Sequence, residues 1–269
     1  MRINHNINAM NANRNLGINV NALGKSTEKL SSGLRINRAG DDAAGLSISE
    51  KMRAQINGLD QASTNAEDAI SMIQTAEGAL NESHSILQRM RTLAVQSAND
   101  TNISADRTAL QKEITELNDE LTRIHNTTQF NKQYMFKEEV NAKFQVGANQ
   151  GESINQKFTK VDAGTLGTGN VNISTQTGAD AAIKTIDGAI EKVSDQRSTL
   201  GARQNRLEHT IANLDNANEN LTAAESRIRD VDMASEMMKF STSNILQQAA
   251  QSMLAQANQQ PAQVLQLLQ

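Results

Sequence analysis

The side chains that most often carry catalysis or bind metal ions are few in this sequence, and they form no known arrangement. The four histidines have no His or Cys partner at helical spacing, and no HExxH segment occurs; they are His5, His84, His125 and His209. No serine lies in a Gly-x-Ser-x-Gly elbow, and the glycine-rich run GTLGTGNVN (164–172) lacks the lysine of a phosphate-binding loop. We therefore expect exposed histidines, a flexible loop at 164–172, and no catalytic residue, metal site or cofactor.

The composition excludes further classes of protein. The 269 residues include no Cys and no Trp, so disulfides, thiolate nucleophiles and Cys-ligated metals are ruled out. A formal net charge of −4 and 2% aromatic residues argue against a nucleic-acid-binding surface. The longest apolar runs are only a few residues, so no membrane span is expected. The core must be built from aliphatic side chains.

Apolar residues recur at a spacing of three and four along both flanks of the chain. One series is Leu110, Ile114, Leu117, Leu121 and Ile124, and a second is Ile73, Ala76, Leu80, Leu87, Met90 and Ala94, interrupted by Ser83. A third extends from about Asp180 to Arg229 and includes Ile186, Val193, Leu200, Leu207 and Leu214. This pattern predicts a mainly α protein whose long heptad-patterned helices form a rod, a coiled-coil-like bundle. The many Ala and polar residues in the pattern make its apolar seam thin.

The two ends of the chain are amphipathic and lack strong helix-forming sequences. The first end is rich in Asn, a poor helix former, and the last is rich in Gln and Ala. We expect the two ends to pair with each other and to complete their folding on association. Between them and the long helices, the run LRINRAGDDAAGL (34–46) predicts a joint in which Gly40 ends one helix and Asp41 or Asp42 caps the next.

The centre of the chain differs chemically from both flanks. Five of the six aromatic residues and many glycines fall between 130 and 178. The run FQVGANQGESI predicts two strands around a turn at 148–151, and so a small β-hairpin region inside the helical protein.

Several segments resemble bacterial flagellin. They are KLSSGLRINRAGDDAAGLSISEKMR (29–53), IQTAEGALNESHSILQRMRTLAVQSAND (73–100), NRLEHTIANLDNANENLTAAESRIRDVDMASEM (205–237), and MLAQANQQP (253–261) followed by VLQLL (264–268). The resemblance covers nearly the whole chain outside the β region. The sequence departs from the family in ending PAQVLQLLQ, where many flagellins close with Arg, and in lacking a long central insert. It therefore resembles a short flagellin without large variable outer domains.

The resemblance implies a division into domains and a set of partners. Residues 1–34 and 234–269 would form an inner domain of terminal helices, 35–46 a spoke, and 47–233 a rod domain that contains the 130–178 hairpin region. The chain would polymerise with itself into a helical filament, and it would meet the flagellar cap and hook-associated proteins. It would be secreted unfolded through the flagellar type III export apparatus, with a cytosolic chaperone on its C-terminal helices. Hosts would sense it through the flagellin-recognising Toll-like receptor.

The same resemblance assigns roles to individual residues. The receptor-contact candidates are Arg89, Leu93, Gln96 and Glu113, and the spoke residues are Arg35, Asn37, Arg38, Gly40, Asp41 and Asp42. Assembly of the inner domain would use the apolar residues of both ends: Ile3, Ile7, Leu16, Val20, Leu23, Leu30, Met238, Ile245, Leu254, Val264, Leu265, Leu267 and Leu268.

The functional prediction is a structural subunit of the extracellular flagellar filament, and not an enzyme. The alternative from the same system is a hook–filament junction protein with flagellin-like ends. A protease carried in the central region is a third class, and the short centre without HExxH argues against it.

Overall fold

The computed structural model describes residues 6–267, and it divides into two compact units. The terminal unit is drawn from the chain up to Gln55 and from Glu219 onward, and the central unit is Ile56–Asn218. Two long helices, α2 (Ala43–Ala98) and α5 (Gln176–Arg229), contribute residues to both. The predicted fold class, mainly helical with a small β region in the middle of the chain, is confirmed.

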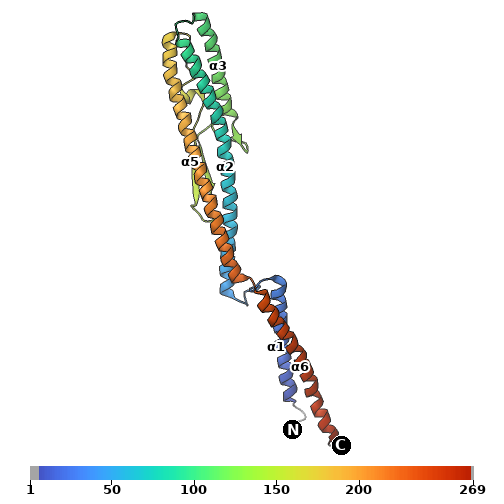
Figure 1. Cartoon of the computed structure of the whole chain (residues 1–269). Coiled ribbons are helices and arrows are strands. Elements are labelled where there is room, and N and C mark those ends of the chain that lie inside the picture. The colour runs from blue at the N-terminus through green and yellow to red at the C-terminus, as the bar shows by residue number, and fades with distance from the viewer. Residues whose placement is uncertain (1–5, 268–269) are drawn as a thin grey trace. The chain divides into compact units, whose positions relative to one another are not determined.

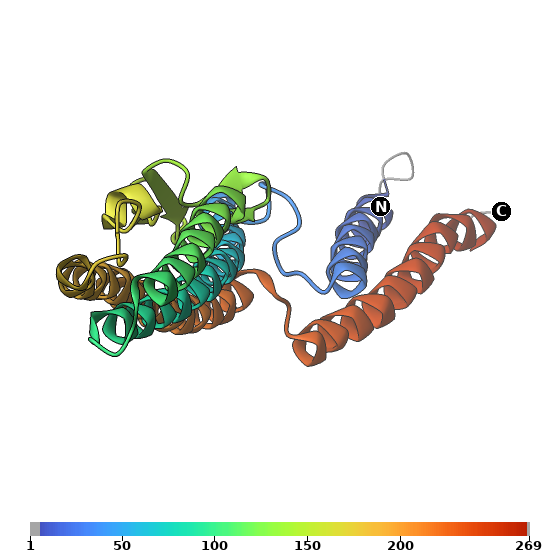
Figure 2. The ribbon, with the colours of Figure 1, turned by 90° about the horizontal axis from the view of Figure 1, so that it is seen from above.

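The central unit is a bundle in which α2, α3 (Ser104–Thr127) and α5 run side by side, as Figures 1 and 2 both show. On α2, eleven consecutive positions at alternating three- and four-residue spacing are all buried: Ala62, Ala66, Ala69, Ile73, Ala76, Leu80, Ser83, Leu87, Met90, Ala94 and Ser97. This is an unbroken heptad seam. Seven of its members are Ala or Ser, so the seam buries little apolar surface in each turn.

The seam of α5 repeats every seven residues. Ile186, Val193, Leu200, Leu207 and Leu214 are all buried. On the shorter α3, Ile114 and Leu121 are buried, while the intervening Leu110 and Leu117 are partly exposed. The predicted heptad pattern is thus confirmed on all three helices, with its most complete burial on α2 and α5.

Two antiparallel hairpins follow α3. The first pairs β1 (Gln129–Phe130) with β2 (Gln133–Tyr134), and the second pairs β3 (Val140–Gln145) with β4 (Ser153–Phe158). The predicted hairpin and its turn are therefore confirmed. The rings of Phe136 and Phe158 are buried and pack edge to face, with 6.4 Å between centroids. The hairpin turn approaches α2 so closely that a Cβ at Gly58 would lie 2.8 Å from that of Ala148.

The segment 159–175, which we name the strap, is folded against the helices, so the prediction of a flexible loop at 164–172 is wrong. It contains the short helix α4 (Ala163–Leu166), and its apolar side chains Leu166, Val171 and Ile173 are buried. Among its glycines, Gly167 takes a left-handed conformation (φ 83°) that ends α4.

Three polar side chains spaced seven residues apart on α3 hold the backbone of the strap. Gln111 donates to the carbonyl of Val171 (3.1 Å) and accepts from the N–H of Ile173 (2.7 Å). Asn118 donates to the carbonyl of Thr168 at 3.0 Å, and His125 Nδ1 accepts from the N–H of Val161 at 3.4 Å. These contacts form a polar ladder along one face of α3.

His125 is buried, which corrects the expectation that every histidine would be exposed. Its position in the heptad frame of α3 turns it toward the strap, whereas His84 is partly exposed and His209 is exposed. His5 lies outside the described residues.

The terminal unit pairs α1 (Ile7–Ser32) with α6 (Met233–Leu267), which lie side by side in both views (Figures 1 and 2). The predicted pairing of the two ends is therefore confirmed. Helix α1 ends at Gly33, whose φ of 72° lets its N–H bond the carbonyl of Lys29. Gly40 was predicted to end this helix, and that is wrong, because the chain has already left the helix and Gly40 has no positive φ.

We predict that protonation of His125 destabilises the central unit. Burial is the main cause that lowers the pKa of His125 below its ordinary 6.5, with the charge of Lys160 adding to it and that of Asp162 opposing it. Because the unfolded chain then binds a proton near pH 6.5 while the folded chain does not, the free energy of unfolding falls as the pH drops below about 6.5.

His125→Gln should remove this part of the pH dependence, measured by urea unfolding between pH 7.5 and about 5. The matched control is His209→Gln, at an exposed position, and it should leave the dependence unchanged. Equal pH profiles for the wild type and His125→Gln would contradict the prediction.

Candidate assembly and recognition surfaces

The contact between α1 and α6 rests on polar groups and small side chains. Ser26 Oγ donates a buried hydrogen bond to Glu236 Oε1 at 2.7 Å, and Lys239 Nζ lies 3.1 Å from the other oxygen of that carboxylate. Towards the other end of the pair, Asn6 Nδ2 donates to the carbonyl of Ala257 at 2.6 Å. The hydroxyl of Ser26 is the main cause that lowers the pKa of Glu236, so the carboxylate is charged at neutral pH.

Most apolar side chains that remain exposed belong to this terminal unit. Among the residues whose side chains the structure describes, fourteen large apolar ones are exposed, and three of them, Val95, Ile103 and Tyr134, lie in the central unit. The other eleven lie in the terminal unit: Ile7, Met10, Ile18, Val20, Ile48, Met233, Met237, Met238, Ile245, Leu246 and Met253. The continuous apolar core, in contrast, is confined to residues of the central unit.

Those residues predicted for inner-domain assembly whose side chains the structure describes fall into an exposed group and a half-buried group. The exposed ones are Ile7, Val20, Met238 and Ile245, and those half-buried in the α1–α6 contact are Leu16, Leu23, Leu30 and Leu254. Val264, Leu265 and Leu267 belong to α6, while Ile3 and Leu268 lie outside the described residues. An alternating set of half-buried and exposed apolar residues leaves part of each helix available to another surface.

The predicted spoke residues form a loop fixed by backbone contacts. Leu34 bridges Asp230, and the N–H of Arg35 donates to the carbonyl of Arg229 at 2.6 Å. The guanidinium of Arg35 also donates to the carbonyl of Ile228, at 3.1 Å from Nε. The loop therefore docks on the end of α5 through main-chain groups.

The acidic residues of the same loop order its backbone. Asp41 accepts from the N–H groups of Asn37 (3.3 Å) and Arg38 (3.1 Å), and the bond to Arg38 is the main cause that lowers the pKa of Asp41. Asp42 caps α2 by accepting from the N–H of Gly45 at 2.9 Å, as predicted. Arg38 Nε pairs with Glu28 at 2.9 Å, which links the loop to α1.

The four receptor-contact candidates lie along α2 and α3; Arg89 and Gln96 are exposed and Glu113 is partly exposed. Arg89 Nε donates to Glu113 Oε1 at 2.8 Å, so this pair joins the two helices, and Gln96 is exposed near the end of α2. Leu93 is 1% exposed and belongs to the apolar core. Its side chain is therefore covered in this fold, and its assignment as a contact residue stays a prediction.

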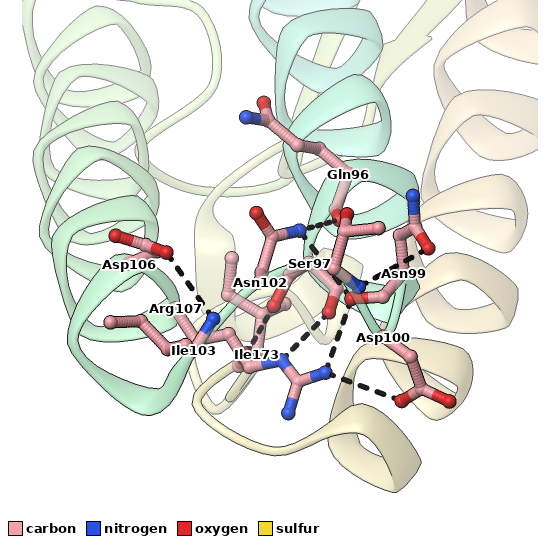
Figure 3. A network of polar contacts seen from close by, with 10 residues as sticks. Gln96, Ser97, Asn99, Asp100, Asn102, Ile103, Asp106, Arg107 and Ile173 are labelled. Atoms are coloured by element: carbon pink, nitrogen blue, oxygen red, sulfur yellow. Dashed lines mark hydrogen bonds and ion pairs between the residues drawn. The ribbon is translucent and has the colours of Figure 1, made fainter.

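The sequence analysis missed a polar network that shapes the turn between α2 and α3. Figure 3 shows Arg107 of α3 reaching back to the carbonyls that end α2, with Nε 3.0 Å from Ser97 O and Nη2 3.2 Å from Asn99 O. Asn102 Nδ2 donates to the carbonyl of Gln96, and the N–H of Ile103 donates to Asp106 at 3.2 Å. A cation at the C-terminal end of a helix is stabilised by its dipole. The one signal in the sequence is the polar run between the two heptad series.

Within residues 6–267, no group of three or more His, Asp or Glu side chains is placed to hold a metal ion. In the same part of the chain, no helix combines the length and hydropathy needed to cross a membrane.

Two family models match this chain, one on each side of its centre. The family model for the bacterial flagellin N-terminal helical region matches residues 3–141, and the model for the bacterial flagellin C-terminal helical region matches 183–268. The chain is 64% identical to flagellin of Halalkalibacterium halodurans and 50% identical to flagellin of Bacillus subtilis, in each case over the full length of both chains.

Solved structures agree with this assignment. The crystal structure of Bacillus cereus flagellin is 33% identical, with a TM-score of 0.52 over 56% of this chain and 88% of that one. A putative flagellar hook-associated protein from Vibrio parahaemolyticus aligns with a TM-score of 0.59 over 71% of this chain and 100% of that one. At 15% identity, the second match demonstrates similarity of fold alone.

We predict that Ser26→Ala weakens the α1–α6 pair by about 1–3 kcal/mol at pH 7, because it leaves the buried Glu236 carboxylate without its main hydrogen-bond donor. Hydrogen exchange of the α1 amides measures the effect. Since the pKa of Glu236 is lowered in the folded state, its stabilisation is present above about pH 4.5 and is lost as the pH falls through the folded pKa.

The difference between Ser26→Ala and the wild type should therefore shrink in acid. Thr27→Ala is the control, since its exposed hydroxyl bonds only the carbonyl of Leu23 within the same helix. A loss that is the same for both variants would contradict a specific role of the Ser26–Glu236 bond.

Proposed function

Because the chain belongs to the bacterial flagellin family and is a structural subunit of the extracellular flagellar filament, we propose that its terminal unit is the part that joins subunits. The family is structural and not enzymatic. Full-length identities of 64% and 50% to flagellins favour a filament subunit over a hook–filament junction protein.

The observation that carries the proposal is the concentration of exposed apolar side chains on α1 and α6. Ile245 and Met238 are each 66% exposed, and each would gain about 1–2 kcal/mol from complete burial. A single subunit offers them no partner, whereas a neighbouring subunit with the same surface does. Repeated head-to-tail contacts that do not close into a ring produce a helical filament.

We further propose the division into an inner domain (1–34 with 234–269), a spoke (35–46) and a rod domain (47–233, including 130–178). Support comes from the end of α1 at Gly33 and from the loop that follows it, which is ordered by Asp41. The main-chain contacts of Leu34 and Arg35 with the end of α5 would then fix the spoke at the point where both terminal helices leave the rod.

The route to the filament is also part of the proposal. The subunit would be secreted unfolded by the type III export apparatus and would assemble under the cap on a base of hook-associated proteins. A cytosolic chaperone would cover α6, whose exposed Met238, Ile245 and Met253 need a partner before assembly. The exposed apolar side chains of α1 and α6 fit a segment that unfolds for passage and refolds on its neighbours.

For the host receptor, we propose contact through the exposed Arg89 and Gln96 and the partly exposed Glu113. Leu93 would act by keeping α2 and α3 packed, since its side chain is buried. The ion pair between Arg89 and Glu113 would hold both groups in one orientation for a polar partner.

Deletion of residues 1–30 or of residues 240–269 should leave a soluble, helical central unit that forms no filaments, because the apolar core lies within 66–207. Circular dichroism checks folding, and negative-stain electron microscopy checks assembly after a polymerisation step. Normal filaments from either truncation would contradict the proposed role of the ends.

Ile245→Asp should abolish or strongly reduce polymerisation of the full chain, because it would bury a carboxylate between subunits. Gln248→Asp is the matched control: it adds the same charge to the same helix at an exposed polar position and should assemble normally. Sedimentation of filaments quantifies both. If the two variants polymerise equally well, the α6 apolar surface is not an assembly surface.

A further inference from the structure

Of the ten methionines, nine lie among the residues whose side chains the structure describes, and eight of these are either well exposed or buried. Five lie in the terminal unit with 48–67% of their area exposed: Met10, Met233, Met237, Met238 and Met253. Three lie in the central unit and are at most 6% exposed: Met72, Met90 and Met135. Met52 is intermediate. Methionine thus supplies five of the eleven exposed large apolar side chains of the terminal unit.

The composition makes these sulfur atoms the main targets of an oxidant. The chain contains no Cys and no Trp, so no thiol or indole competes for a hydroperoxide. A thioether sulfur attacks one oxygen of the peroxide, the O–O bond breaks, and an S–O bond forms. The sulfur is oxidised by two electrons to the sulfoxide, and the leaving oxygen takes up the proton of the peroxide, which is reduced to water from hydrogen peroxide or to an alcohol from an organic hydroperoxide. The product is a polar, chiral side chain where an apolar one stood.

We propose that Met10, Met233, Met237, Met238 and Met253 are oxidation sites through which a hydroperoxide blocks polymerisation of the free subunit. This inference rests on the proposed role of the terminal unit in assembly. Oxidation would leave each subunit folded, since the apolar core lies in the central unit. It would place sulfoxide oxygens on the surface that neighbouring subunits bury, and an unpaired polar group buried there opposes association.

The filament should resist the same oxidant. Once subunits assemble, the terminal unit's methionines are covered by neighbours, and the peroxide reaches them only through subunit dissociation or local opening. The modification would therefore act on subunits before assembly and would spare filaments already made.

The sites are tested first by mass spectrometry of the intact, folded monomer after a timed exposure to hydrogen peroxide. Peptides carrying the five exposed methionines should gain one oxygen at least about tenfold faster than those carrying Met72, Met90 and Met135, which are internal controls for burial. Equal rates for the two sets would overturn the assignment, as would oxidation of preformed filaments as fast as that of monomers.

The consequence is tested with a variant in which all five exposed methionines are replaced by leucine, a swap that conserves volume and apolarity. Treated wild-type monomer should lose sedimentable filaments, whereas the treated leucine variant should polymerise as well as untreated protein. Treatment with methionine sulfoxide reductases for both epimers should restore assembly of the wild type.

The outcomes separate this inference from the function on which it rests. If the untreated wild-type chain forms no filaments, or if Ile245→Asp assembles normally, the proposed assembly surface fails. If those experiments succeed but oxidised wild-type protein polymerises normally, only the oxidation inference fails. Equal loss of assembly in the wild type and the leucine variant would likewise overturn it, because damage elsewhere would then be responsible.

Discussion

The thinness of the apolar seam is the constraint on which the rest of this structure depends. Along α2, seven of eleven consecutive seam positions are Ala or Ser. A buried methyl group contributes about 0.8 kcal/mol, against about 1.5–3 kcal/mol for a buried Leu or Ile. Stability must therefore accumulate over many turns, which explains why α2 and α5 extend over 56 and 54 residues. Small seam residues also allow neighbouring helices to pack at a short interaxial distance.

The terminal unit leaves many of its large apolar side chains exposed in a single subunit. Its two helices meet through a buried Ser26–Glu236 bond, and small residues such as Ala250 and Ala257 are buried, while several leucines are half-buried and eleven large apolar residues are exposed. In the central unit, by contrast, large apolar side chains such as Ile, Leu and Phe are buried in a continuous core. A pair of helices joined in part by polar contacts fits the proposal that this segment is unfolded for export and is then buried by neighbouring subunits.

Outside the seam, polar side chains of the central unit form hydrogen bonds with main-chain atoms of neighbouring segments. Gln111, Asn118 and His125 occupy one face of α3 at intervals of seven residues and bond main-chain atoms of the strap. Arg107 does the same for the carbonyls at the end of α2. Contacts of this kind do not depend on the side chains of the bonded residues, because every residue offers the same main-chain atoms.

The sequence alone determined the helices, their heptad register, the central hairpin and the family. Periodic apolar residues and turn residues are local signals, and residues such as Leu200 or Gly151 act through neighbours a few positions away. Only the tertiary structure decided the rest. Gly33 and not Gly40 ends α1, the strap is packed, and His125 and Leu93 are buried. Each of these depends on a segment distant in sequence: the strap on α3, and the spoke loop on the end of α5. Whether a residue is buried depends on which distant segment packs against it, and the residue's own position in the sequence does not show this.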